Sequence, residues 1–133
     1  NEIKGYKNIY YHGHSDNIIE ELKESNCVVL PTYYKEGTPK VLLEAASLEI
    51  PIIATNIAGV NDILSDNFNG FFCNEKDAID LSKKMEKMYK LPNNQRIIFG
   101  ENGRKLAIKK FDTSILLSIY KKSLNSLSQI NNN

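Results

Sequence analysis

Two glutamates, Glu36 and Glu44, stand eight residues apart around a Gly-Thr-Pro turn in the segment YYKEGTPKVLLEAASLEIPIIAT. A turn of this kind that leads into a helix can bind an anion, because the first amides of a helix lack partners and the helix dipole favours negative charge. Carboxylates instead accept hydrogen bonds from hydroxyl groups. A phosphate at the helix start, with hydroxyl-rich groups on both sides, is the layout of a nucleotide diphosphate sugar.

The helix that must position Glu44 is predicted to begin at Pro39. Thr38 is expected to be its N-cap, and proline at the first helical position costs no hydrogen bond. The third helical residue is Val41, so no capping-box glutamate reaches back, and first-turn amides are expected to stay free. On a helical wheel Glu44 falls at the edge of the apolar face, with its carboxylate directed toward the helix start.

Short apolar runs alternate with helical periods, which predicts βαβ units and a Rossmann-like, three-layer α/β domain with a parallel sheet. About four strands are expected, at residues 8–13, 27–32, 51–55 and 70–74. Crossover helices are expected at 15–25, 38–49 and 59–66, with Ser15 as the N-cap of the first. C-terminal helices are expected at 75–90, 93–111 and 112–129. Ligands bind at the carboxyl ends of such strands, where the turn before Pro39 falls.

Length and charge narrow the class of protein. A chain of 133 residues is expected to form one domain with one core. Its 17 basic and 16 acidic residues leave a net charge of +1, without the positive excess that nucleic-acid binding needs. No signal peptide and no apolar run of roughly 20 residues is present, which favours a cytoplasmic protein. Cys27 and Cys73 are expected to be reduced core residues.

The sequence contains no complete set of ligands or motif for a cofactor. His12 and His14 offer two imidazoles, whereas zinc needs three or four ligands. Neither Asp-x-Asp nor Gly-x-Gly-x-x-Gly occurs, so the sequence predicts no metal and no organic cofactor. The glycine of IAGVNDIL, Gly59, fits either a plain turn or a close backbone approach to a ligand. The basic run at 103–110 is expected to be a solvated helix face.

The order of these motifs resembles the C-terminal part of the retaining group 1 glycosyltransferases (family 4) of GT-B fold. The family motif Glu-Gly-x-Pro-x-x-x-x-Glu-Ala is matched at Glu36, Gly37, Pro39, Glu44 and Ala45. YYHG precedes the motif, and NGFFC and GRKLAIKKF follow it in the expected order. The resemblance implies that residues 1–133 form one partial C-terminal domain of a GT-B fold, which binds the nucleotide sugar.

The resemblance also implies a role for individual residues. Glu36 would bind hydroxyls of the donor sugar and Glu44 the ribose of the nucleotide. The remaining donor-sugar residues would be Gly37, Thr38 and Pro39, and the remaining nucleotide or diphosphate residues Lys40, Val41, Gly13 and His14. The last two stand at the YHG turn, where such enzymes often receive the base.

The activity implied is transfer of a sugar from a nucleotide sugar to a glycan or lipid-linked acceptor, with retention at the anomeric carbon. The acceptor domain, the start of the donor domain and the family's basic Arg/Lys pair are not recognised before Asn1, so this chain alone is expected to be inactive. The full-length enzyme is expected to associate peripherally with the inner face of the membrane.

Two alternatives stay open at the level of the sequence, and one further expectation concerns self-association. The alternatives are a GT-B nucleotide-sugar epimerase and a non-catalytic α/β binding module of receiver or flavodoxin type.

Self-association is expected if the last helix exposes apolar surface. The residues expected to form that surface are Ile115, Leu116, Ile119 and Tyr120.

Overall fold

The computed structural model describes residues 6–34, 37–115, 117–118 and 121 of the chain. The elements follow in the order α1 (Ile18–Lys23), β1 (Val28–Leu30), α2 (Lys40–Ser47), β2 (Ile52–Thr55), the 3-10 turn η1 (Val60–Asp62), β3 (Gly70–Cys73), α3 (Ala78–Lys90) and α4 (Asn93–Phe111). Strands β1, β2 and β3 form a parallel sheet in that order. The predicted α/β class with a parallel sheet is confirmed.

Strand β2 separates two cores, and all four of its residues are buried. Because side chains alternate along a strand, Ile52 and Ala54 face one core while Ile53 faces the other. The first core collects apolar side chains from α1, α2, η1 and α4, and the second collects them from α3 and the start of α4. The domain therefore has three layers, and a central strand that reads as an unbroken apolar run fits burial on both faces.

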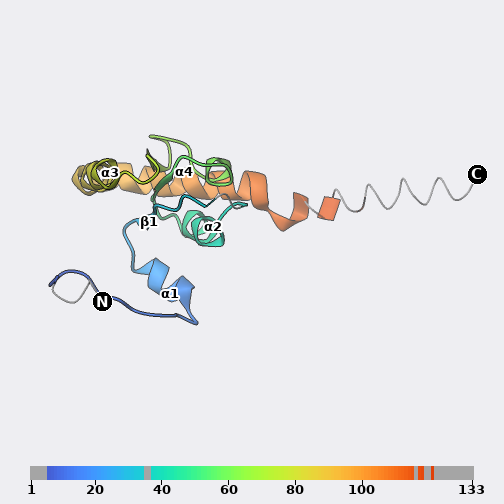
Figure 1. Ribbon diagram of the computed structural model, residues 1–133. Coiled ribbons are helices and arrows are strands. Elements are labelled where there is room, and N and C mark those ends of the chain that lie inside the picture. Colours follow the sequence, from blue (N-terminus) through green and yellow to red (C-terminus); the bar gives the residue numbers. More distant parts are fainter. Residues whose placement is uncertain (1–5, 35–36, 116, 119–120, 122–133) are drawn as a thin grey trace, which may run out of the picture.

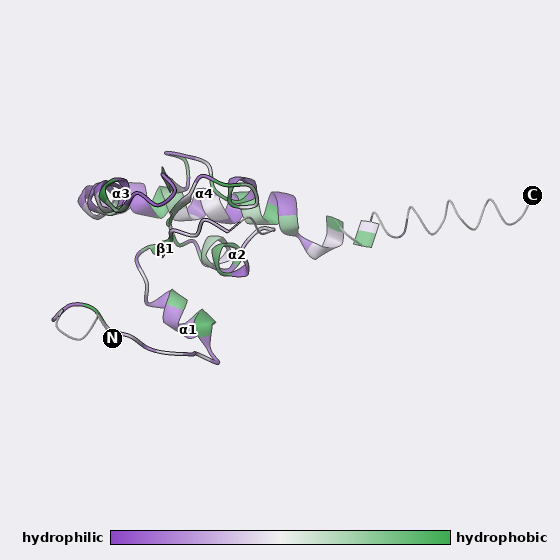
Figure 2. Ribbon diagram, viewed as in Figure 1, coloured by the Kyte–Doolittle hydropathy of each residue, from purple (hydrophilic) through white to green (hydrophobic). Residues whose placement is uncertain are grey.

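Helix α2 fills the first core with Leu42, Ala45 and Ala46. Figure 2 shows hydrophobic and hydrophilic sides along this helix. The long α4 runs beside it (Figure 1) and approaches so closely that a Cβ added at Gly100 would lie 1.9 Å from the carbonyl oxygen of Glu49. A glycine is therefore required where α4 crosses the end of α2, and this contact fixes α2 against the rest of the domain.

The predicted strand at residues 8–13 is wrong, and the described sheet has three strands rather than four. Aromatic and β-branched residues form a strand only where a neighbouring strand supplies hydrogen bonds and packing. Within the described sheet β1 pairs with β2 alone, and Tyr10 and Tyr11 are exposed. Figure 1 shows this N-terminal segment apart from the sheet, on the far side of α1.

Two predicted helix starts are corrected. Helix α1 begins at Ile18 after Asn17, and Ser15 Oγ accepts a hydrogen bond from the Asn17 amide instead of capping the helix. Helix α3 begins at Ala78 rather than at residue 75. Its N-cap is Asp77, whose carboxylate accepts the amides of residues 79 and 80 at 3.1 and 2.9 Å.

The helix predicted at 59–66 is only the short turn η1. Gly59 opens it with φ 84°, a conformation that favours glycine. The buried side chain of Asn69 then accepts the Ser65 amide and donates to the Ile63 carbonyl, both at 2.8 Å. These are backbone groups that a longer helix would have used, so the turn ends early.

The C-terminal helix is described in part. Leu116, Ile119 and Tyr120 lie outside the described residues, while Ile115 is half-buried and Leu117 is exposed. The predicted self-association surface therefore stays a prediction. Within the part of the chain that the structure describes, no helix combines the length and the hydropathy needed to cross a bilayer.

Candidate functional site

The loop that follows β1 leads into the N-terminus of α2 at the carboxyl edge of the sheet. The helix starts one residue later than predicted: Pro39 is the N-cap and Lys40 the first helical residue. The reason is the ψ of 129° at Pro39, which is extended, so only its carbonyl takes part by accepting the amides of Leu42 and Leu43 at 3.0 and 3.3 Å. Thr38 therefore precedes the cap instead of forming it.

This helix start leaves amides without partners. Proline has no side-chain oxygen, so the N-cap supplies no side-chain hydrogen bond. Among the described residues, none accepts a hydrogen bond from the amides of Lys40 or Val41. Free amides at the positive end of a helix dipole are the feature that binds phosphate groups.

Glu44 lies one turn into α2, at the margin of the core. Its side chain is 18% exposed, and its Oε1 lies 3.3 Å from Nζ of Lys40, whose side chain is 87% exposed. Since Lys40 is the first helical residue, this pairing places the carboxylate on the N-terminal side of its own turn. A half-buried carboxylate and an exposed ammonium thus stand next to the free amides.

Gly37 has no packing reason to be a glycine in the described structure. A Cβ added there would meet nothing within 4 Å, and the residue is exposed. An open backbone of this kind lets a ligand approach the chain closely. Glu36, predicted to bind the donor sugar, lies outside the described residues, as does Lys35.

Gly13 and His14 are not brought to this helix start. Both are exposed, Gly13 has φ 72°, and the His14 Nε2 lies 3.5 Å from Asp16 Oδ1. They belong to the N-terminal segment that Figure 1 shows apart from the sheet and from α2. Their predicted contact with the base therefore has no geometric support in this arrangement, because the segment that carries them is not paired with the sheet.

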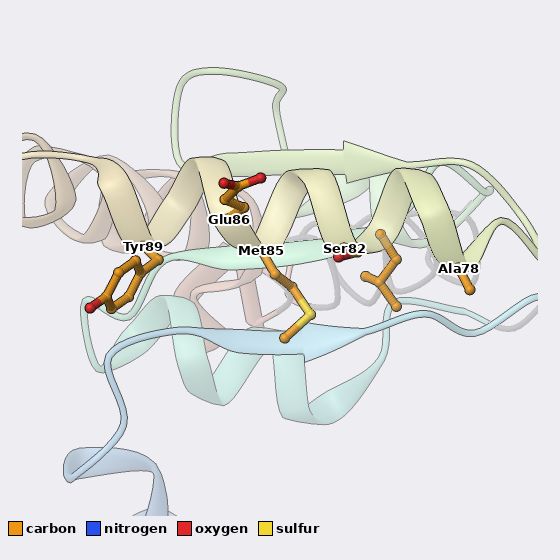
Figure 3. A pocket seen from close by; sticks show the side chains of 6 residues that line it. Ala78, Ser82, Met85, Glu86 and Tyr89 are labelled. Carbon is orange, nitrogen blue, oxygen red and sulfur yellow. The ribbon is translucent and has the colours of Figure 1, made fainter. Parts of the chain in front are cut away.

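A hollow of about 430 Å³ runs along α3, away from the start of α2, and is lined by Ala78, Leu81, Ser82, Met85, Glu86 and Tyr89. Figure 3 shows Met85 and Tyr89 on its wall, beside Glu86. The Glu86 carboxylate pairs with Lys90. The wall is mainly apolar and offers no convergent set of polar groups for a nucleotide.

The neighbouring surface on the same side of the sheet holds the Cys27 thiol, whose pKa burial raises to about 12. Such a thiol stays protonated and unreactive near neutral pH. Among the described residues no group of three or more His, Cys, Asp or Glu side chains is arranged for a metal ion.

The basic run on α4 is a solvated face with structural contacts, as expected. Arg104 lies 3.4 Å from the Glu49 carboxylate, and Lys110 donates to the Asp62 carbonyl at 2.8 Å. Ala107 is buried in the first core. These side chains hold α4 in place and do not reach the start of α2.

The sequence did not predict one cluster, which is formed by Tyr33, Tyr34 and Lys76. The rings of Tyr33 and Tyr34 stack with 4.7 Å between centroids, and Nζ of Lys76 lies 4.7 Å from the Tyr33 centroid. The sequence signal was the tyrosine doublet itself, directly before the Glu-Gly motif. The distant partner Lys76 had no sequence signal, since only the fold brings the loops after β1 and β3 together.

The chain belongs to the family described as "Glycosyl transferases group 1", whose model matches residues 2–106. It is 33% identical over 103 residues to the capsular polysaccharide biosynthesis glycosyltransferase CapM of Staphylococcus aureus, which covers 77% of this chain and 27% of that protein. It is 29% identical over 114 residues to a Campylobacter jejuni N,N'-diacetylbacillosaminyl-diphospho-undecaprenol alpha-1,3-N-acetylgalactosaminyltransferase, covering 86% of this chain and 30% of that protein.

Solved structures have the same fold. Anabaena Alr3699/HepE in complex with UDP has a TM-score of 0.77 at 17% identity, covering 84% of this chain and 30% of that chain. TarM has a TM-score of 0.68 at 28% identity, covering 85% of this chain and 22% of that chain. The chain spans less than a third of the length of these proteins. The predicted group 1 family and the partial Rossmann-like α/β domain are confirmed.

Proposed function

We propose that this chain is the donor-binding part of a glycosyltransferase that moves a sugar from a nucleotide sugar to a glycan or lipid-linked acceptor, with retention at the anomeric carbon. Family membership supports the reaction class. The names of the relatives include a transferase that acts on a diphospho-undecaprenol acceptor, and the HepE structure is a complex with UDP. Neither alternative from the sequence is favoured by these relatives.

The observation that carries the proposal is the unsatisfied start of α2. The diphosphate would accept hydrogen bonds from the amides of Lys40 and Val41, which have no partner among the described residues. Lys40 would move from Glu44 toward the phosphates, since the lysine side chain is 87% exposed and a lysine–glutamate pair four residues apart on a helix contributes only about 0.5 kcal/mol. Glu44 would then accept the ribose hydroxyls, and Glu36 and Gly37 would face the sugar.

This chain's residues would supply binding and charge stabilisation of the departing diphosphate. Amides fixed at a helix start need no reorganisation as negative charge develops on the leaving group, which is the way fixed dipoles lower a barrier. No metal or organic cofactor enters this proposal. The enzyme would act in the cytoplasm, at the inner face of the membrane when its acceptor is lipid-linked.

The test is amide chemical-shift mapping of the isotope-labelled protein during titration with UDP. We expect the largest shifts at Lys40 and Val41. The matched control is the start of α4, which also begins after a proline, Pro92, without a side-chain cap. Equal shifts at Asn93 and Asn94 would indicate a general effect of anions on helix ends, and an absence of shifts at both helices would contradict the proposed UDP site.

A further inference from the structure

Tyr33 and Tyr34 form a stacked aromatic pair that is not part of either core. Their planes meet at 28° with 4.7 Å between centroids, and the residues are 46% and 63% exposed. Single exposed aromatic residues are common, but two adjacent rings held together in solvent are a contiguous apolar surface. Stacking holds the two rings against each other, but it leaves their outer faces exposed to solvent.

Lys76 ties this pair to a distant loop. It stands three residues after β3, just as Tyr33 stands three residues after β1, so both lie beyond the carboxyl ends of parallel strands. Its ammonium lies 4.7 Å from the centre of the Tyr33 ring, within the range of a cation–π interaction. The Lys76 backbone has φ 54°, a left-handed conformation that is costly for a residue with a Cβ and that concentrates at functional sites.

A hollow of about 250 Å³ opens beside Lys76 at the same edge. It is lined by Pro31, Asn74, Lys76, Asp77, Ala78 and Leu81. The Asp77 carboxylate accepts the amides of Ile79 and Asp80 through Oδ1, and hydrogen bonds from the Asp80 amide and the Asn74 side chain lower its pKa. An apolar floor is thus combined with an amide, a carboxylate and an ammonium group.

We propose that the tyrosine pair and this hollow bind a pyranose ring, with the ring stacked on Tyr34 and its hydroxyls near Asn74 and Asp77. A pyranose has an apolar face of C–H groups and a rim of hydroxyls, which matches an aromatic surface beside a carboxylate and an amide. Tyr34 is three residues before Gly37 on the loop that carries the donor motif. The inference rests on the proposed function and adds a second sugar contact to that loop.

Tyr33, Tyr34 and Lys76 would have different roles in this site. Tyr34, the more exposed ring, contacts the sugar, while Tyr33 and Lys76 are positioning residues that hold it in place. The pyranose has two sources, the sugar of the donor and a sugar of the acceptor. Both present the same chemistry to the aromatic ring, so substrate-specific measurements must separate them.

The experiment uses the full-length enzyme with Tyr34→Ala, Tyr34→Phe and the control Tyr89→Ala. Tyr89 is also an exposed tyrosine, 82% accessible, but it lies in the last turn of α3, far from the carboxyl edge. Calorimetry measures the Kd of UDP and of UDP-glucose. Saturation-transfer NMR measures binding of methyl α-D-glucopyranoside to the UDP-saturated enzyme.

If the donor sugar stacks on Tyr34, Tyr34→Ala weakens UDP-glucose by about threefold to tenfold and leaves the Kd of UDP unchanged. If the acceptor sugar does, the Kd of UDP-glucose is unchanged and saturation transfer to the methyl glucoside is lost. In both cases Tyr34→Phe and Tyr89→Ala behave like the wild type. Lys76→Met should produce the same pattern with a smaller change, because it only loosens the stack.

Wild-type behaviour of Tyr34→Ala toward both sugars would overturn the inference while leaving the proposed function intact. Weaker binding of UDP itself by Tyr34→Ala would also overturn it, since the loop would then act on the nucleotide. A wild-type enzyme that does not bind UDP would contradict the proposed UDP site and this inference together.

Discussion

The ammonium of Lys40 and the carboxylate of Glu44 face each other across the first turn of α2, with 3.3 Å between Nζ and Oε1. The two side chains differ in freedom, because the lysine is nearly fully exposed while the glutamate is half-buried. The lysine can therefore change partner when a ligand arrives, and the glutamate stays where the helix holds it.

Lys40→Met is expected to weaken UDP binding by about tenfold without changing the melting temperature. A charge-assisted hydrogen bond to phosphate contributes more to binding than a lysine–glutamate pair four residues apart on a helix contributes to folding. Calorimetry at low and high salt measures the effect, which should shrink as salt screens the charge. Lys90→Met, which removes the lysine of another lysine–glutamate pair four residues apart, on α3, is the control. A large loss of stability in Lys40→Met would show that the pair is structural.

Glu44→Ala and Glu36→Ala are expected to separate ribose binding from sugar binding in the full-length enzyme. Glu44→Ala should weaken UDP and UDP-glucose alike, by about ten- to a hundredfold, because both ligands carry the ribose. Glu36→Ala should leave UDP binding nearly unchanged and lower turnover, because its partner hydroxyls belong to the sugar. Calorimetry with both ligands and steady-state kinetics give the two readouts.

The control for this pair is Glu86→Ala, which removes a glutamate from another lysine–glutamate pair four residues apart, on α3. It should change neither ligand affinity nor turnover. Equal loss of UDP binding in Glu36→Ala and Glu44→Ala, with both variants folded, would refute the division of roles.

Gly100→Ala is expected to destabilise the domain, by about 1–3 kcal/mol or more, because the new Cβ would lie 1.9 Å from the Glu49 carbonyl oxygen. Gly103→Ala on the same helix is the matched control. Its Cβ would lie 3.5 Å from the nearest atom, an ordinary contact, and alanine favours the helix by up to about 1 kcal/mol. Urea denaturation of both variants measures the difference. Equal stabilities would mean that α4 does not touch the end of α2 as described.

The buried Cys27 thiol is expected to make the free energy of unfolding depend on pH. Burial raises its pKa from 9.0 to about 12, so above pH 9 the unfolded chain releases this proton before the folded chain does. This contribution to folding is fully present below pH 9 and is lost as the pH rises toward 12, at up to about 1.4 kcal/mol per pH unit. Cys27→Ala should show a shallower decline between pH 9 and 11 in urea denaturation. If the stability of Cys27→Ala and of the wild type declined in parallel with pH, the thiol would be solvent-exposed in the folded chain.

The sequence predicted the helices and strands that pack against other elements of the described domain. Apolar runs placed β1, β2 and β3, and helical periods placed α2, α3 and α4, because each of these elements finds its partners within the described domain. The segment 8–13 has the composition of a strand but no neighbour in the described sheet, and composition alone does not reveal that. The length of η1 depended on the side chain of Asn69, a tertiary contact.

The sequence also predicted part of the candidate site. The free amides followed from the absence of a capping box, and the one-residue shift at Pro39 depended on a single ψ angle. The family resemblance supplied the roles of Glu36 and Glu44, which spacing alone does not distinguish from a solvated loop and helix edge. The partnership of Lys76 with Tyr33 depends on the order of the strands and therefore required the fold.

Strand β2 has a hydrogen-bonded neighbour on each side and a covered face above and below, whereas β1 has three residues and one described neighbour. The loop with Gly37 leaves from β1. Local unfolding is easiest where backbone hydrogen bonds are few, so the amides of β1 are expected to exchange with solvent faster than those of β2. A ligand bound at the start of α2 would stabilise the neighbouring carboxyl end of β1, and part of its binding free energy would appear as slower hydrogen exchange along β1.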